Sequence, residues 1–89
     1  MQVQAKHILV EDLNTAITLK AKLNDGSTFG ELARAYSSCP SRARDGDLGS
    51  FGPGMMVKPF EDAAFALEVG QVSEPVQTQF GWHLIERTG

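Results

Sequence analysis

The sequence predicts a single α+β domain built on an antiparallel sheet. Apolar residues alternate with a period of two near both ends of the chain, which is typical of half-buried strands, and they recur with helical spacing in between. The expected order is β-α-α-loop-β-α-β-β, without the rhythm of long parallel strands joined by helices. With 89 residues, 42% of them hydrophobic, the chain can bury one core but not two, so we expect one domain over residues 1–89.

The first and last strands, expected at residues 3–9 and 82–87, each carry a histidine on an apolar face. His7 shares its face with Val3, Ala5 and Leu9, and His83 shares its face with Ile85. A buried imidazole needs a hydrogen-bond partner, and if the two strands pair, the simplest partner is the other histidine. The alternative is that each is a core histidine bonded to a backbone carbonyl. This buried pair is the first candidate for function.

Two helices follow the first strand. Asp12 is suited to cap a helix that runs to about Leu23 and stops before Gly26, a residue able to take positive φ. Its expected apolar arc is Leu13, Ala16, Ile17, Leu19 and Leu23. Thr28 and Glu31 have the spacing of a capping box, which predicts the start of the second helix. Its expected buried stripe is Phe29, Leu32, Ala33 and Tyr36.

The segment 37–54 is irregular and rich in Ser, Gly and Pro. We expect a short helical turn after Pro40 and a short strand around residues 50–51. Pro59 fits the first turn of a third helix that reaches about Leu67. Short strands are expected at 72–73 and 75–78. Connections longer than about 10 residues are usually functional in compact domains, and this one carries the only cysteine.

Composition excludes several classes of partner. The formal net charge of −3 argues against broad attraction to nucleic acid or to an anionic membrane surface. No apolar run approaches the ~18 residues of a membrane-spanning helix, and no basic-then-apolar leader occurs, so membrane insertion is not expected. A single cysteine allows no internal disulfide, which favours a reducing compartment. We expect a cytoplasmic protein, or alternatively a module of a larger one.

Cys39 precedes a predicted helical turn and lies near Arg42 and Arg44. A thiol in such a place can be reactive, and with a histidine it would suit a thiol hydrolase; the alternative is a small buried apolar side chain. No obvious oxyanion-hole motif supports the hydrolase. Neither histidine has metal-ligand spacing to another His, Cys or Asp, so no metal site is expected.

The glycine-rich segment 46–54 does not match a phosphate loop. It lacks a Gly-Lys-Ser/Thr ending, and Asp47 would repel phosphate. The apolar residues that follow, Met55, Met56 and Val57 before Phe60, could instead form an adaptable apolar pocket.

Five motifs, in order and at compatible spacings, resemble the parvulin-type peptidyl-prolyl cis/trans isomerases, or rotamases. They are KHILV at 6–10, SCPS at 38–41, GDLG at 46–49, MVKPFE at 56–61 and FGWHLI at 80–85. The resemblance runs over nearly the whole chain. It implies a four-stranded antiparallel sheet surrounded by about four helices, with the site on the concave side of the sheet and without a cofactor.

The resemblance also implies roles for individual residues. The expected catalytic set is His7, Cys39, Thr78 and His83, in which Cys39 takes a position that parvulins fill with Cys or Asp and Thr78 orients a histidine. The expected pocket for the substrate proline ring is formed by Leu48, Met56 and Phe60. Phe80 would close one side of that pocket.

The chain departs from the phosphorylation-directed parvulins, which carry a basic cluster in an extended loop after the first strand. Here that loop is nearly absent, and the strand leads into Glu11 and Asp12, two acids that would repel phosphate. The expected function is non-covalent isomerisation of X-Pro bonds that assists protein folding. Its expected partners are proline-containing peptides and unfolded or partly folded proteins, and a monomer is expected. The alternative is a non-catalytic chaperone or binding module for extended Pro-containing segments.

Overall fold

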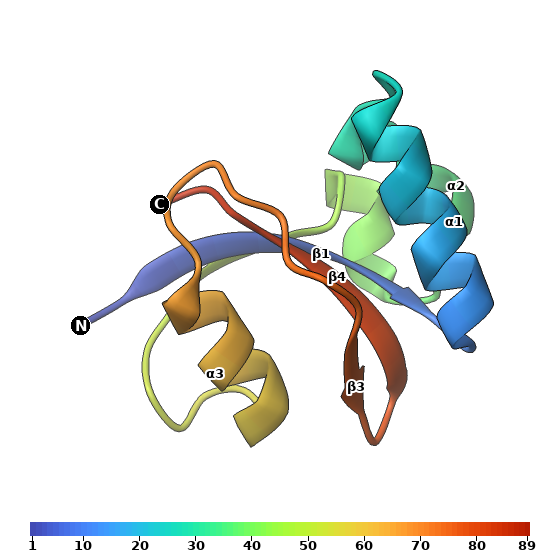
Figure 1. The fold of residues 1–89 in the computed structure, drawn as a ribbon. Helices are drawn as coiled ribbons and strands as arrows, with labels where there is room; N and C mark the ends of the chain where they lie inside the picture. Colours follow the sequence, from blue (N-terminus) through green and yellow to red (C-terminus); the bar gives the residue numbers. More distant parts are fainter.

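The computed structural model describes residues 1–89 and contains a four-stranded antiparallel sheet, three α-helices and one 3-10 helix (Figure 1). The strands are β1 (Val3–Val10), β2 (Asp47–Phe51), β3 (Val76–Thr78) and β4 (Gly81–Arg87). The helices are α1 (Leu13–Asn24), α2 (Phe29–Tyr36) and α3 (Lys58–Ala66), with the 3-10 helix η1 at Pro40–Arg44. The predicted α+β class and element order are confirmed. The sheet is surrounded by three α-helices and one 3-10 turn, where about four helices were expected.

The first and last strands lie side by side at the centre of the sheet. The strand order is β2-β1-β4-β3, and every neighbouring pair is antiparallel. In the central pair His7 lies opposite Ile85, and Leu9 lies opposite His83. Each histidine is therefore the diagonal neighbour of the other, a position within reach of long or aromatic side chains.

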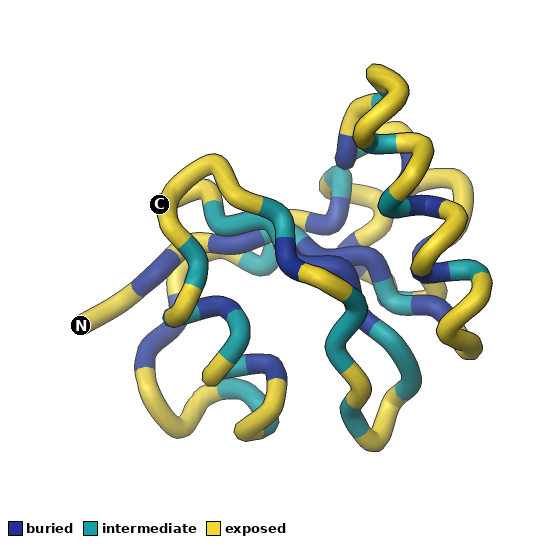
Figure 2. Tube along the Cα trace, viewed as in Figure 1, coloured by how far each residue is buried: buried dark blue, intermediate teal, exposed yellow.

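Helices cover both faces of the sheet, and both faces of β1 are buried in its second half, whereas Gln4 in its first half is exposed. In Figure 1, α1 and α2 lie on one side of the central strands and α3 lies on the other. The core beside α1 and α2 contains Ile8, Val10, Ala16, Leu19, Phe29, Leu32, Ala33 and Leu84. The core beside α3 contains Val3, Ala5, Phe51, Phe60, Ala64 and Ile85. Figure 2 shows burial concentrated along the central strands, with the outer sides of the helices exposed.

Both predicted helix caps are present. The Asp12 carboxylate accepts hydrogen bonds from the backbone N–H of Thr15 (3.1 Å) and from its hydroxyl (2.7 Å). At the start of α2, the Thr28 hydroxyl accepts from the N–H of Glu31 (3.2 Å) and donates to the Glu31 carboxylate (2.8 Å). These bonds satisfy N–H groups that the first turn of a helix leaves free.

The predicted apolar arc of α1 is wrong at two positions. Leu13 is 39% exposed and Ile17 is 51% exposed. The face of α1 toward the sheet instead carries the buried Ala16 and Leu19, with Leu23 packed against the same core. The Lys20 side chain is 20% exposed, and its ammonium group donates to the carbonyl of Ser73 (3.0 Å) and to Glu74 (2.9 Å). A lysine that buries its methylenes and keeps its charge paired can take a position that polarity alone would place in solvent.

Three further expectations are corrected. Tyr36 is 49% exposed, because α2 ends there and the extended backbone of Ser37 puts Ser37 in the buried position instead. The strand expected at 50–51 is longer and begins at Asp47. Residues 72–73 form no strand, and Val72 makes only an isolated bridge to Glu86.

Two glycines allow the backbone on either side of β1 to pass close to it. Gly46 has φ +85°, and a Cβ there would lie 2.4 Å from the carbonyl oxygen of His7. Gly81 has φ +137°, and a Cβ there would lie 2.5 Å from the carbonyl oxygen of Val10. A side chain at either position would collide with a carbonyl oxygen of β1 and force the two backbone segments apart. None of the helices has both the length and the apolar character required to span a bilayer.

Candidate active site

The predicted histidine pair exists and lies on the α3 side of the sheet. Nδ1 of His7 and Nδ1 of His83 are 3.0 Å apart, within hydrogen-bond distance, and the rings stack with an interplanar angle of 21°. The two side chains are 5% and 4% exposed. The hydrogen-bond partner of each Nδ1 is therefore the other imidazole and not a backbone carbonyl.

Thr78 contacts His83 at the ring nitrogen that does not face His7. Its hydroxyl lies 2.7 Å from Nε2 of His83, and it also accepts a hydrogen bond from the backbone N–H of Phe80 (3.2 Å). Thr78 lies at the end of β3, where that strand pairs with β4, so the sheet itself brings it beside His83. Both ring nitrogens of His83 therefore have partners, whereas Nε2 of His7 is buried and has none.

Burial keeps both imidazoles neutral. Desolvation, followed by repulsion from His83, lowers the pKa of His7 to about 4, and desolvation lowers the pKa of His83 to about 4. At neutral pH one proton lies between the two Nδ1 atoms. Either His7 donates it and His83 Nε2–H donates to Thr78, or His83 donates it and the Thr78 hydroxyl donates to His83.

An open cavity of about 500 Å³ lies over the histidine pair. It is lined by six of the seven predicted site residues, namely His7, Cys39, Leu48, Met56, Phe60 and His83, and by Phe80. Thr78 is the exception, because it lies behind His83 and not in the lining. The ring of Phe60 is roughly perpendicular to both imidazoles, at 5.6 Å from His7 and 5.2 Å from His83 between ring centroids.

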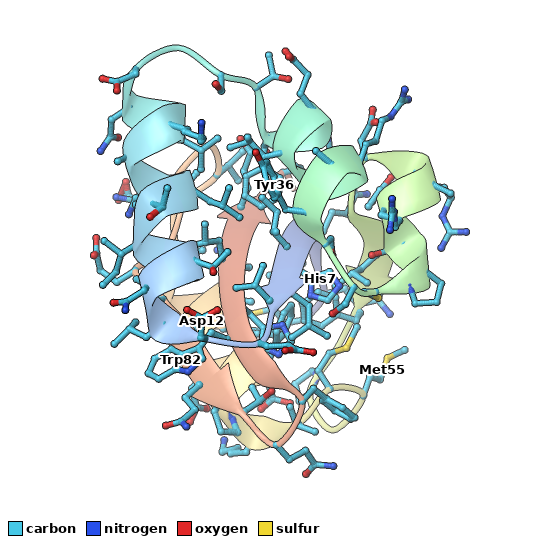
Figure 3. All side chains as sticks on the ribbon, turned by 90° about the vertical axis from the view of Figure 1, so that its right-hand side faces the viewer. His7, Asp12, Tyr36, Met55 and Trp82 are labelled. Carbon is cyan, nitrogen blue, oxygen red and sulfur yellow. The ribbon has the colours of Figure 1, made fainter.

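The cavity has apolar walls, and no Asp, Glu, Lys or Arg side chain lines it. Met55 and Phe80 form parts of its lining that are strongly exposed, at 63% and 61%. Figure 3 shows His7 in the interior of the molecule and Met55 on an outer loop. With both imidazoles neutral, the site offers apolar contact and hydrogen bonds but no formal charge.

Cys39 lines the same cavity and is half-buried. Its sulfur makes no hydrogen bond to either histidine, since the hydrogen bonds of His7 and His83 go to each other and to Thr78. The geometry of a histidine-activated thiol nucleophile is therefore absent.

Three lining residues, Leu9, Ser38 and Pro40, were not expected to be part of the site. Leu9 follows His7 on the same face of β1, so strand alternation contains the signal for it. Ser38 and Pro40 flank Cys39 on an irregular segment, where no periodicity predicts the direction of a side chain. No group of three or more His, Cys, Asp and Glu side chains is arranged to hold a metal ion.

A second cavity, of about 580 Å³, is lined mostly by polar residues of α1, α2 and the sheet. It contains none of the predicted site residues. The chemistry of the molecule is therefore placed at the histidine cavity, which combines apolar walls with a buried hydrogen-bond network.

An uncharged pocket of this kind suits a reaction that turns a bond without making or breaking one. The family model described as rotamase, PPIC-type PPIase domain, matches residues 7–89. The chain therefore belongs to the PPIC-type peptidyl-prolyl isomerases, the parvulin class that its motifs resemble. The family description names a peptidyl-prolyl isomerase domain, and the names of the relatives include foldase and peptidylprolyl isomerase.

Similar proteins include foldases and single-domain parvulins. The chain is 56% identical to the foldase protein PrsA 4 of Bacillus cereus over 88 residues, which are 98% of this chain and 31% of the relative. PrsA from Bacillus subtilis is 45% identical with a TM-score of 0.97, over 99% of this chain and 35% of that one. NmPin, the parvulin of Nitrosopumilus maritimus, is 48% identical with a TM-score of 0.89, over 99% of this chain and 96% of that one. The chain thus spans about a third of the PrsA relatives and nearly all of NmPin.

Proposed function

We propose that the histidine cavity binds the proline of an X-Pro segment and catalyses rotation about its peptide bond non-covalently, without need of a phosphate. The observation that carries this proposal is the neutral His7–His83 pair at an apolar cavity without charged side chains. Clients would be proline-containing peptides and unfolded or partly folded proteins.

The physical demand of the reaction fits such a cavity. Rotation must cross a barrier of ~18–20 kcal/mol that arises from amide resonance. The planar amide is polar, whereas the twisted transition state has lost that charge separation. A pocket that holds the ring and keeps water from the amide therefore favours the twisted form. Each ~1.36 kcal/mol removed from the barrier raises the rate tenfold, so several kcal/mol suffice.

The roles of the residues follow from their places. Leu48, Met56 and Phe60 would hold the proline ring, and the Phe60 ring also contacts both imidazoles edge-on. The His7–His83–Thr78 network has two neutral proton arrangements, so it can adjust as the substrate carbonyl swings. Cys39 would act through its polarity and shape, without forming a covalent bond.

Selectivity against phosphate is supported by charge. The cavity lining holds no Lys or Arg, and the exposed acids Glu11 and Asp12 follow β1 two residues beyond Leu9, which lines the cavity. A phosphate beside the proline would meet no cation to pair with and would be repelled by these carboxylates.

The test is an isomerisation assay with matched peptides that carry apolar residues, serine or phosphoserine before proline. We expect kcat/KM for phosphoserine to be no higher than for serine, and apolar residues to be turned over well. A clear gain from phosphate would contradict the proposed selectivity. Binding of all peptides without acceleration of any would make the domain a binding module.

The proposed oligomeric state and cellular location follow from two further features of the chain. We propose that the domain acts as a monomer, because its site is formed within one chain, and sedimentation at micromolar concentration would reveal a dimer. The single cysteine suits a reducing compartment such as the cytoplasm. Cell fractionation of the producing organism would test that location.

A further inference from the structure

In the ladder between the two histidine strands, some residues turn their backbone groups outward, and two of them are bonded by buried serines. In an antiparallel pair, alternate residues turn their N–H and C=O groups away from the opposite strand. Leu9 and Ile85 are such residues, because their N–H groups bond elsewhere. Each lies opposite a histidine: Leu9 faces His83, and Ile85 faces His7.

A buried serine satisfies the first of these positions. The hydroxyl of Ser37 accepts a hydrogen bond from the N–H of Leu9 (3.1 Å), and the N–H of Ser38 donates to the carbonyl of Leu9 (2.8 Å). Ser37 is 1% exposed. The same hydroxyl also accepts from the N–H of Cys39 (3.3 Å), which ties a cavity-lining residue to β1.

A second buried serine repeats this arrangement on β4. The hydroxyl of Ser73 accepts from the N–H of Ile85 (3.1 Å), and the N–H of Ser73 donates to the carbonyl of Ile85 (2.8 Å). Ser73 is 7% exposed, and its carbonyl accepts from the ammonium group of Lys20 (3.0 Å). The two serines hold the histidine strands from opposite outer sides.

No strand takes the place of either serine. The pairing of β2 with β1 ends at Lys6 and Asp47, before Leu9 is reached. The pairing of β3 with β4 begins at Val76 and His83, and leaves Ile85 outside it. The serines therefore complete the sheet where its edge strands are too short.

We propose that Ser37 and Ser73 are positioning residues that set the separation of the His7 and His83 rings for isomerisation. The proposal rests on the proposed function of that pair. Ser37 fixes Leu9, which lies opposite His83 and two positions after His7 on β1. Ser73 fixes Ile85, which lies opposite His7 and two positions after His83 on β4. Outward movement of either strand lengthens the contact between the two Nδ1 atoms.

The test compares Ser37→Ala, Ser73→Ala and the double variant with the unmodified chain. Ser41→Ala is the matched control, because Ser41 is 4% exposed but its hydroxyl has no hydrogen-bond partner. Imidazole nitrogen signals are recorded by ¹⁵N NMR on the folded proteins, and kcat and KM are measured separately. Loss of global stability alone would not move the imidazole signals of molecules that remain folded.

Each single serine variant is expected to shift the nitrogen signals of both histidines and to lower kcat by about tenfold with little change in KM. The double variant should lose less than the product of the single losses, because both act on one contact. The control should match the unmodified chain. Unchanged imidazole signals and kcat in both single variants would overturn the proposal.

A measurement on the unmodified chain covers the case in which a variant fails to fold. The amide protons of Leu9 and Ile85 should exchange with solvent as slowly as those of Ile8 and Leu84 inside the ladder. Fast exchange at Leu9 and Ile85 would overturn the proposal without any substitution. Neither NMR readout depends on turnover. A chain without isomerase activity in which the serines still set the contact between the His7 and His83 rings would disprove the proposed function but not the positioning role of the serines.

Discussion

His7 and His83 are neutral at physiological pH because the folded protein removes both rings from water. Strand alternation was sufficient to predict that they face the same core, since each lies among apolar neighbours on a terminal strand. Alternation could not predict which nitrogen atoms meet. That contact depends on the diagonal register of β1 against β4, which places Nδ1 beside Nδ1.

The first prediction concerns acid stability. Both histidines have a folded pKa of about 4 and an unfolded value of 6.5, so the unfolded chain binds more protons between those pH values. The free energy of unfolding should therefore be fully retained above pH 6.5 and fall as the pH drops toward 4. Urea unfolding across this interval measures the slope.

His7→Asn should roughly halve that slope, since one of the two titrating imidazoles is removed. Asp12, whose pKa is lowered from 3.8 chiefly by its hydrogen bond to the Thr15 side chain, titrates below this interval and does not obscure it. A stability that stays flat from pH 6.5 to 4 would contradict the neutral buried pair.

The second prediction concerns Cys39. Because its sulfur has no histidine partner, replacing it with Asp or Ser should lower kcat/KM without abolishing it. No covalent adduct with substrate should appear by mass spectrometry. Loss of activity to the uncatalysed rate in both variants, with the fold intact, would restore a nucleophilic role.

At the scale of single elements, α3 carries one phenylalanine that lines the cavity and another that only packs in the core. Phe60 and Phe65 both approach Phe51 in the core, at 6.0 Å and 6.1 Å between ring centroids. Only Phe60 also lines the histidine cavity. The third prediction is that Phe60→Ala lowers both stability, by about 3–5 kcal/mol, and kcat/KM. Phe65→Ala should lower stability and leave kcat/KM near that of the unmodified protein.

Unfolding curves and kinetics measured on the same preparations, at a temperature where both variants are folded, distinguish the two effects. Equal losses of kcat/KM in both variants would mean that packing of α3, and not the Phe60 ring itself, supports catalysis.

The fourth prediction concerns the capping box of α2. Thr28→Ala should cost about 0.5–2 kcal/mol of stability, because the N–H of Glu31 loses its acceptor. The exposed threonine Thr18 of α1, whose hydroxyl donates to the carbonyl of Asn14, provides the control, and Thr18→Ala should cost less. The midpoint of thermal unfolding measures both. A larger loss from Thr18→Ala would contradict the importance of the cap.

For the whole molecule, the class, the order of elements and most of the site were predictable from sequence. Capping residues, prolines, glycines and apolar periodicity are local signals, and they placed every helix and the two central strands. Local patterns did not predict which face of α1 is buried, because they could not show that Lys20 donates to Ser73, 53 residues away along the chain. The motif resemblance supplied Thr78 and Leu48 and gave Cys39 its expected non-covalent role.

The pairing of the first strand with the last has a consequence for the making of the protein. His7 and His83 are 76 positions apart in the sequence. During synthesis, His7 is therefore present long before β4, which carries His83, has been translated. Contacts this distant in sequence form late and slowly. A partly synthesised chain lacks this pair, and under the proposed function each new molecule gains its activity only when β4 joins β1.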